Sequence, residues 1–327
     1  MSHRSHGFRP SVWGRVNIAI VPEAEKSANS ILRADSPKMI LVMSSTGMFG
    51  RPVVEGLAKR GLSVRATGRS EKALAALDAP GAELISADMD DPSTLPQLMK
   101  GVDKVLVNAP MDDKKEVRLR NVIEAMIQSG HGAKIVLLTG GVEHDDELGT
   151  AGLATERLMR SSGLPWTVVG PQTVMETNFK PFRELIQAES MLMSCVGSAK
   201  VGFVALEDVT NAFINVLDSP KEAHVGCEYM ITGPEAVTFE DVATAATEAL
   251  DRRIIYQDMP RDEFRNLMLT EAGFTEADVD IEVMCHLDAF RAGKAARITD
   301  DFTSLTGKKP KSVREWWIAN ADFFMSA

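Results

Sequence analysis

The stretch that decides the fold is residues 39–57, MILVMSSTGMFGRPVVEGL. It begins with an apolar run, passes through two serines, a threonine and two glycines, and continues as an amphipathic run. A short apolar run bounded by turn residues predicts a buried strand, and the apolar spacing that follows predicts a helix near 49–60. The segment is therefore expected to form a strand, a tight turn and a helix.

The same alternation continues along the chain. Further strands are expected at 63–67, 82–86, 103–108, 134–139 and 166–170, and further helices near 71–78, 93–100, 114–129 and 151–162. Near-continuous apolar strands separated by helices predict a parallel sheet that is covered on both faces. Right-handed crossovers then give a doubly wound α/β Rossmann sheet, with a binding crevice at the carboxyl ends of the strands.

After residue 171 the pattern becomes less regular. A strand at 201–206, a helix at 207–217 and a strand at 228–232 are expected before a mostly helical tail, 238–327, which opens in a capping-box-like T-x-x-D. These elements predict a smaller, mainly helical C-terminal substrate lobe. The expected organisation is a nucleotide-binding domain over 39–171, to which 201–232 returns, and a substrate lobe over 172–200 and 233–327.

The first 38 residues differ from the rest of the chain. They hold Arg4, Arg9 and Arg15 but no acid before Glu23. Such a start is typical of transit peptides, but a disordered tail or a start codon upstream of the true one is favoured, because Met39 opens the first strand. Residues 1–38 are therefore expected to lie outside the fold, and the protein is expected to be cytoplasmic.

The composition excludes several classes of protein. The chain has 327 residues, of which 44% are hydrophobic, so it can bury a full core. Its net charge of −10, with basic residues dispersed among acids, argues against nucleic-acid binding. No apolar run approaches the ~18 residues of a membrane span. Cys195, Cys227 and Cys285 are odd in number and widely spaced, which predicts buried thiols and neither a disulfide framework nor a metal site.

The turn after the first strand resembles a dinucleotide-binding turn. Gly47 and Gly50 take the second and third glycine positions of the G-x-G-x-x-G pattern, whereas Ser44 replaces the first glycine, which a serine can do if its backbone keeps a negative φ. Backbone N–H groups at the helix start would bind the pyrophosphate. A loop that only packs is the alternative. The expected cofactor-binding residues here are Ser44, Ser45, Thr46, Gly47, Met48, Phe49 and Gly50, the hydroxyls of the second and third acting as donors.

The end of the second strand indicates which cofactor is bound. An NAD site usually places an acid there to bind the ribose 2′-hydroxyl, but this chain has Arg69. A guanidinium suits a 2′-phosphate, so NADP(H) is predicted in preference to NAD(H), with Lys72 as a helper. The alternative is that Arg69 only solvates a helix start, beside Glu71.

Several stretches together resemble the NmrA-like family of atypical short-chain dehydrogenases/reductases. They are SSTGMFGRPVVEGL, the arginine of ATGRSEK, ADMDDPSTL followed by GVDKVLVNAP, ATERLMRSSGLPWTVVGPQ, and ITDDFTSLTGKKPKSVREWW. The resemblance runs from Met39 to the end of the chain. It implies that Asp88 and Met89 flank the adenine, that Asn108, Ala109 and Pro110 run under the cofactor, that Thr139 and Gly140 lie beside the nicotinamide, and that Pro171 braces its carboxamide.

The usual proton donor of short-chain dehydrogenases, a Tyr-x-x-x-Lys pair, is missing. Neither Tyr229 nor Tyr256 is followed by a lysine four residues later. Alignment on Glu156 puts Leu148 and Gly152 where the pair would stand. Carbonyl–alcohol chemistry is therefore disfavoured. Hydride transfer to a quinone, an azo or triarylmethane dye or an activated alkene remains, since such acceptors need little acid help.

The acceptor pocket is expected at the loops after the fourth, fifth and sixth strands. His144 is the candidate proton donor, with water or a merely solvated loop histidine as the alternatives. Trp166 is expected close to this crevice. The predicted pocket residues are Met111, Gly141, Gln172, Met175, Asn178 and Phe179.

Two functions remain open. The favoured one is an NADPH-dependent oxidoreductase that acts on a small-molecule acceptor, because an apolar pocket containing methionines suits a flat ligand. The alternative is a non-catalytic NADP(H) sensor that regulates a protein partner, which the missing Tyr-x-x-x-Lys pair favours. Fold alone does not decide between them, and a homodimer is left open.

Overall fold

The computed structural model describes residues 39–110, 112, 114–142 and 147–325. Seven strands form one sheet in the order β10-β6-β5-β4-β1-β2-β3, and all neighbouring pairs are parallel. The predicted doubly wound α/β sheet is confirmed, and its strand order reverses between β1 and β4. The strands are β1 (Met39–Val42), β2 (Val64–Gly68), β3 (Glu83–Ser86), β4 (Val102–Val107), β5 (Lys134–Leu138), β6 (Trp166–Pro171) and β10 (Cys227–Ile231).

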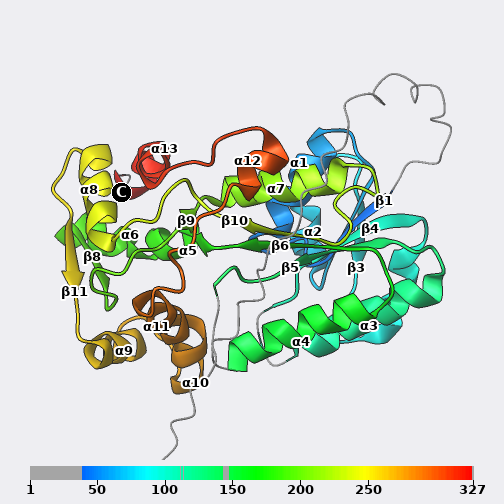
Figure 1. The fold of residues 1–327 in the computed structure, drawn as a ribbon, viewed down its shortest axis with the longest axis horizontal. Coiled ribbons are helices and arrows are strands. Elements are labelled where there is room, and N and C mark those ends of the chain that lie inside the picture. Colours follow the sequence, from blue (N-terminus) through cyan, green and yellow to red (C-terminus); the bar gives the residue numbers. More distant parts are fainter. Residues whose placement is uncertain (1–38, 111, 113, 143–146, 326–327) are drawn as a thin grey trace, which may run out of the picture. The chain divides into compact units, whose positions relative to one another are not determined.

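Helices cover both faces of this sheet. In Figure 1, α1 (Gly50–Lys59), α7 (Leu206–Asp218) and α12 (Asp301–Thr306) lie on one face, and α3 (Lys115–Ser129) and α4 (Glu147–Ser161) run side by side on the other. Alternate residues of β1 face the two layers. Ile40 and Val42 join the core under α1 and α7, whereas Leu41 and Met43 join the core under α3.

Three predicted elements differ from the structure. The helix expected at 93–100 is a pair of 3₁₀ turns, η2 (Pro92–Thr94) and η3 (Pro96–Met99), because a proline at the second turn removes a helical N–H donor. Helix α2 (Glu71–Ala75) is shorter than expected. The strand expected at 201–206 is reduced to β9 (Phe203–Val204).

The C-terminal third is mainly helical, as predicted, and α8 opens in the expected capping box between Thr238 and Asp241. Two small parallel strand pairs, β7 with β9 and β8 with β11, were not predicted. The remaining elements are β7 (Thr173–Val174), α5 (Met175–Phe179), η4 (Lys180–Phe182), α6 (Arg183–Glu189), β8 (Met191–Ser194), α8 (Phe239–Leu250), β11 (Ile255–Asp258), α9 (Arg261–Thr270), α10 (Glu276–Val279), the π-helical turn η5 (Asp280–Met284), α11 (Cys285–Arg291) and α13 (Val313–Met325).

Glu176 ties three of these helices together. Its Oε2 accepts a hydrogen bond from the backbone N–H of Leu206 at 2.9 Å, at the start of α7, and its Oε1 accepts one from the indole N–H of Trp316 on α13 at 2.9 Å. The glutamate itself lies on α5. Helix α5, which follows β6 and β7, is thus fixed to the start of α7 and to the C-terminal helix α13. The division into nucleotide domain and substrate lobe stays a prediction.

The three cysteines are all free thiols. Cys195 is buried as expected, but Cys227 and Cys285 are partly exposed, so the expected burial is wrong for these two. Within the described residues, no group of three or more histidine, cysteine, aspartate or glutamate side chains could hold a metal ion. No described helix is both long and apolar enough to span a bilayer.

Candidate cofactor site

Ser44 adopts a left-handed backbone conformation with φ of 48°. The expected negative φ is therefore wrong. A left-handed serine costs about 1–2 kcal/mol, which a glycine would not incur. Its carbonyl oxygen accepts a hydrogen bond from the N–H of Gly47 at 3.0 Å, which closes the turn after β1.

Gly50 is required by close packing. A β-carbon on this residue would lie 2.3 Å from the carbonyl oxygen of Ser44, well inside contact distance. A β-carbon on Gly47 would lie 3.3 Å from the same oxygen. The turn therefore folds tightly over the Ser44 carbonyl, and Gly50 performs the helix–strand packing expected of the third glycine.

The two hydroxyls of the turn differ in their surroundings. Ser45 is fully buried; its hydroxyl donates to the carbonyl oxygen of Val42 at 2.7 Å and accepts from the N–H of Thr67 at 3.0 Å. The expected donation from the Ser45 hydroxyl to a cofactor is therefore wrong, because its proton already joins β1 to the turn. Thr46 is half-buried beside Gly68, and its role stays a prediction.

The N-terminus of α1 has open donors. Its N-cap residue Phe49 makes no side-chain cap, and the first turn holds no acid. The N–H groups of Met48, Phe49 and Gly50 make no hydrogen bond to any other residue that the structure describes. Unsatisfied N–H groups at the positive end of a helix dipole bind anions such as phosphate.

Arg69 follows β2 and is exposed. The start of α2 is capped by Ser70, whose hydroxyl accepts from the N–H of Ala73 at 3.2 Å. An N–H group at the start of α2 is thus capped by Ser70 and not by Arg69. This weakens the alternative that Arg69 only solvates the start of that helix. The guanidinium remains available for an anion at the carboxyl end of β2.

Arg118 was not predicted as a site residue, yet it joins two of the predicted loops. From α3 it donates to both carboxylate oxygens of Asp90, after β3, at 2.9 and 3.0 Å, and to those of Asp112, after β4, at 2.7 Å. The hydrogen bond from Arg118 lowers the pKa of Asp90. An arginine among inward-facing apolar residues of the predicted helix was the available signal. Asn121 adds a hydrogen bond to the carbonyl oxygen of Met89 at 2.9 Å.

The predicted nicotinamide end lies where β4, β5 and β6 finish. Asn108, Ala109 and Pro110 follow β4, Thr139 and Gly140 follow β5, and Pro171 ends β6. Gly141 donates its N–H to the carbonyl oxygen of Pro171 at 2.8 Å, and a β-carbon on Gly141 would lie 2.7 Å from that oxygen. The loops after β5 and β6 are therefore in close contact.

Buried polar atoms without partners mark this same edge. The hydroxyl of Thr67, at the end of β2, and both amide atoms of Gln172, just after β6, are buried and make no hydrogen bond. Each such group costs about 1–3 kcal/mol unless a ligand or water satisfies it. The chain therefore fits a ligand that brings anionic groups to α1 and hydrogen-bonding groups along the edge, as a dinucleotide does.

The acceptor pocket is only partly as predicted. Met175 and Phe179 are fully buried, and the Phe179 ring packs against Phe203 at 4.8 Å and Trp316 at 5.4 Å between ring centroids. The pocket prediction is therefore wrong for these two residues, which belong to the core of the C-terminal helices. Asn178 is partly exposed and donates to the carbonyl oxygen of Val174 at 2.8 Å.

Of the other residues considered in the sequence, two lie outside the described part of the chain and three lie on strands. Met111 and His144 lie outside the described residues. Both tyrosines are on strands, Tyr229 on β10 and Tyr256 on β11. Trp166 is the first residue of β6, so it lies at the opposite edge of the sheet from the cofactor turn, and its expected place by the crevice is wrong.

Lys115, the first residue of α3, is a buried cation close to the loop after β4. Burial lowers the pKa of Lys115 to about 8, and Glu156 on α4 acts in the opposite direction. Burial also raises the pKa of Glu156, against the effect of Arg160. Sequence reasoning missed this lysine, because it stands at a helix start that reads as solvent-exposed.

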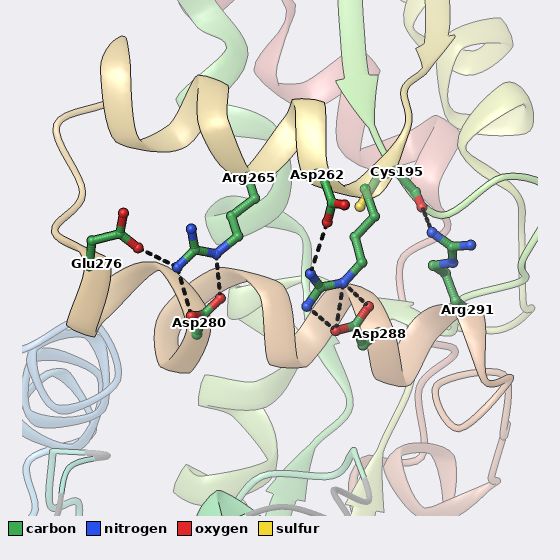
Figure 2. Close-up of polar contacts among 8 residues, drawn as sticks. Cys195, Asp262, Arg265, Glu276, Asp280, Asp288 and Arg291 are labelled. Carbon is green, nitrogen blue, oxygen red and sulfur yellow. Dashed lines mark hydrogen bonds and ion pairs between the residues drawn. The ribbon is translucent and has the colours of Figure 1, made fainter.

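A separate cavity of about 940 Å³ lies where β8 and β11 end, between α9 and α11. Figure 2 shows Arg265 of α9 directed at Asp280 and Glu276, and Arg291 directed at the backbone of Cys195. Charged residues of the cavity lining also pair with one another: Arg261 forms an ion pair with Asp288 at 2.7 Å. None of the predicted site residues is among its described lining.

Comparison with known proteins identifies the family. The model of the NAD(P)H-binding family matches residues 45–220, more than half of the chain. This match begins inside the turn after β1 and ends just after α7, so it covers five strands of the sheet, β2 to β6, and the predicted cofactor residues from Ser45 to Pro171. The chain belongs to the NAD(P)H-binding family.

Relatives of similar length share the whole fold. An NAD(P)H azoreductase from Xenophilus azovorans is 27% identical over 293 residues, covering 88% of this chain and 100% of the relative. A triphenylmethane reductase from Citrobacter sp. has a TM-score of 0.77 at 25% identity, covering 86% of this chain and 99% of that one. A mutant NmrA structure has a TM-score of 0.69 at 17% identity, covering 87% and 95%. The resemblance to NmrA-like atypical reductases is confirmed.

Proposed function

We propose that this protein is an NADPH-dependent oxidoreductase that transfers hydride to a small, flat acceptor such as an azo dye, a triarylmethane dye, a quinone or an activated alkene. The reaction class is supported by relatives named as an azoreductase and a triphenylmethane reductase, each matched over nearly its whole length. The single observation that carries the proposal is the open anion site at the start of α1 with Arg69 beside it.

The choice of NADPH rests on Arg69. An exposed guanidinium at the end of β2 suits a 2′-phosphate, and Arg69 stands where an NAD site usually places an acid to bind the 2′-hydroxyl. Ser70 already caps α2, so the arginine is not needed for the helix start. The preference for NADPH over NADH therefore follows from charge.

In the proposed reaction the chain binds and orients, and the bound cofactor supplies the hydride. The α1 N-terminus holds the pyrophosphate, and Arg118 fixes the loops after β3 and β4. Segments 172–200 and 233–327 supply the acceptor side, where Asn178 is a partly exposed polar residue. Because α4 carries no Tyr–Lys pair, the product takes its proton from water or from His144.

A second candidate function is a non-catalytic NADP(H)-binding regulator of a protein partner. It is favoured by the burial of Met175 and Phe179, because an acceptor pocket then has fewer apolar residues to line it. The missing Tyr–Lys pair favours it as well. Both functions require the same cofactor site, so turnover is what distinguishes them.

The test is NADPH oxidation against a panel of azo dyes, triarylmethane dyes and quinones. We expect turnover with NADPH, and Arg69→Ala should lower kcat/KM for NADPH about 10- to 100-fold while changing that for NADH by less than about threefold, because one charge-assisted contact is lost. Arg253→Ala, which removes an exposed arginine after α8, is the matched control and should have no effect. NADPH binding without turnover of any acceptor would favour the regulator.

A further inference from the structure

The side-chain amide of Gln172 is buried and has no hydrogen-bond partner. The residue is only 6% exposed, and neither its Nε2 nor its Oε1 makes a hydrogen bond. The other unpartnered side chains among the described residues each leave one atom unsatisfied. Gln172 leaves a donor and an acceptor unsatisfied on one planar group, which native proteins rarely tolerate without a ligand or water.

The position of Gln172 is fixed by its backbone. Its N–H donates to the carbonyl oxygen of Ile231 on β10 at 2.9 Å, immediately after β6. Its Cα lies 3.0 Å from where a β-carbon on Gly141 would stand, so the glycine leaves room for it. The backbone of Gln172 is therefore packed against Gly141, in the turn after β5.

This place is within reach of a dinucleotide that starts at α1. The sheet order β1-β4-β5-β6 puts three strand spacings, about 14 Å, between the phosphate turn and Gln172. A dinucleotide in such a sheet lies across the switch point along the carboxyl ends of the strands. The end of the cofactor opposite to adenine then comes to the turn after β5 and to Gln172.

The chemistry of the amide selects its partner. A side-chain amide that lacks both a donor partner and an acceptor partner is complementary to a group that presents an acceptor and a donor side by side. A phosphate, a carboxylate or a quinone carbonyl offers only acceptors and would leave Oε1 unsatisfied. A primary carboxamide satisfies both atoms, in either orientation of the glutamine amide.

We propose that the side-chain amide of Gln172 binds the carboxamide of nicotinamide through two hydrogen bonds. Nε2 donates to the carboxamide oxygen, and the carboxamide nitrogen donates to Oε1. This inference rests on the proposed function and adds a specificity residue to it. Two parallel bonds fix the rotation of the nicotinamide ring, so the chain accepts a dinucleotide with a carboxamide and discriminates against one with another group at that position.

The experiment is a calorimetric titration with NADP⁺ and with its 3-acetylpyridine analogue, in which a methyl ketone replaces the carboxamide and the donor is lost. Wild-type protein should bind NADP⁺ about tenfold more tightly than the analogue, the effect of one hydrogen bond. Gln172→Leu should bind NADP⁺ at least about tenfold more weakly and should bind both compounds equally. Gln257→Leu, at an exposed glutamine of β11, should keep the wild-type ratio.

Adenosine 2′,5′-bisphosphate separates this inference from the proposed function. It lacks nicotinamide, so Gln172→Leu should bind it as the wild type does. If wild-type protein binds NADP⁺ and the analogue equally, or Gln172→Leu keeps the wild-type ratio, the inference is overturned while the cofactor site stands. If wild-type protein binds neither NADP⁺ nor the bisphosphate, the proposed function and the inference fail together.

Discussion

Ser44 shows how a turn keeps its shape after its first glycine is lost. The residue has a φ of 48°, in the region that glycine occupies most easily. Its carbonyl oxygen is still enclosed by Gly47 and Gly50, as the glycine pattern requires. The serine therefore raises the energy of the turn without changing its backbone conformation. The N–H groups at the start of α1 keep no hydrogen-bond partner among the described residues.

Ser44→Gly should stabilise the protein. The substitution removes left-handed strain of about 1–2 kcal/mol and adds some unfolded-state entropy, so the free energy of unfolding should rise by about 0.5–1 kcal/mol. Urea denaturation measures the change. Ser44→Ala keeps the strain and is the control, which should give no increase. Equal effects of the two variants would contradict the strain that we assign to this residue.

At the scale of elements, α3 holds the loops that follow β3 and β4. The side chain of Arg118 is 9% exposed and pairs with Asp90 and Asp112, which are 31% and 42% exposed. Two residues later, the ion pair of Arg120 among the described residues is with Glu116 of the same helix, and both side chains are exposed. The two arginines share a helix and differ in what they connect, so they form a matched pair for mutation.

Arg118→Ala should lower the free energy of unfolding by about 2–3 kcal/mol and weaken NADPH binding severalfold. It removes the ion pairs that Arg118 makes with Asp90 and Asp112 and so releases both loops. Arg120→Ala should cost less than about 0.5 kcal/mol, the usual value of an exposed pair within a helix. Denaturation and NADPH titration of both variants check this. Equal losses would mean that Arg118 does not organise the loops.

At the scale of the whole molecule, two buried lysines close the edge of the sheet opposite to the cofactor. Lys104 on β4 and Lys134 on β5 are paired neighbours in the register. Lys104 donates to the carbonyl oxygen of Leu217 at 2.6 Å, and Lys134 to that of Ala223 at 2.7 Å. Burial, and then the charge of Lys104, lower the pKa of Lys134 to about 8.

Stability should therefore rise with pH above 8. The folded-state pKa of Lys134 lies below the unfolded value, so between pH 8 and about 10 the unfolded chain binds more protons and the free energy of unfolding increases. Lys134→Met should reduce this rise, by on the order of 1 kcal/mol, whereas Lys309→Met at an exposed site should not. Lys115, whose pKa burial lowers to about 8 as well, contributes to the part that remains in Lys134→Met. Cys195 acts in the opposite direction, because burial raises the pKa of its thiol.

The readings must stay below about pH 10, where tyrosine begins to ionise in the unfolded chain. Burial raises the pKa of Tyr229 and Tyr256, so both oppose stability at higher pH. A wild-type stability that is flat or falling between pH 8 and 10 would contradict the account of the buried lysines.

The sheet could be predicted because buried parallel strands and amphipathic helices differ in the spacing of their apolar residues. Residues 39–57 also located the turn between the first strand and the first helix. Prediction from the sequence failed where burial depends on distant segments. Phe179 resembles a pocket residue until α13 brings Trp316 against it. The hydroxyl of Ser45 resembles an open donor, but the folded turn directs its proton to the carbonyl oxygen of Val42, and β2 brings the N–H of Thr67 to its oxygen. Arg118 stands among the inward-facing apolar residues of its helix, which marks it as unusual, but its two partners are loops that only the folded chain brings together.

The most direct test of the central claim is a calorimetric titration of the wild-type protein with NADPH and with NADH. We expect one NADPH to bind per chain, at least about tenfold more tightly than NADH, because the 2′-phosphate gains a charge-assisted contact with Arg69. Binding of neither cofactor, or equal binding of both, would contradict the site that we place at the start of α1 and the end of β2.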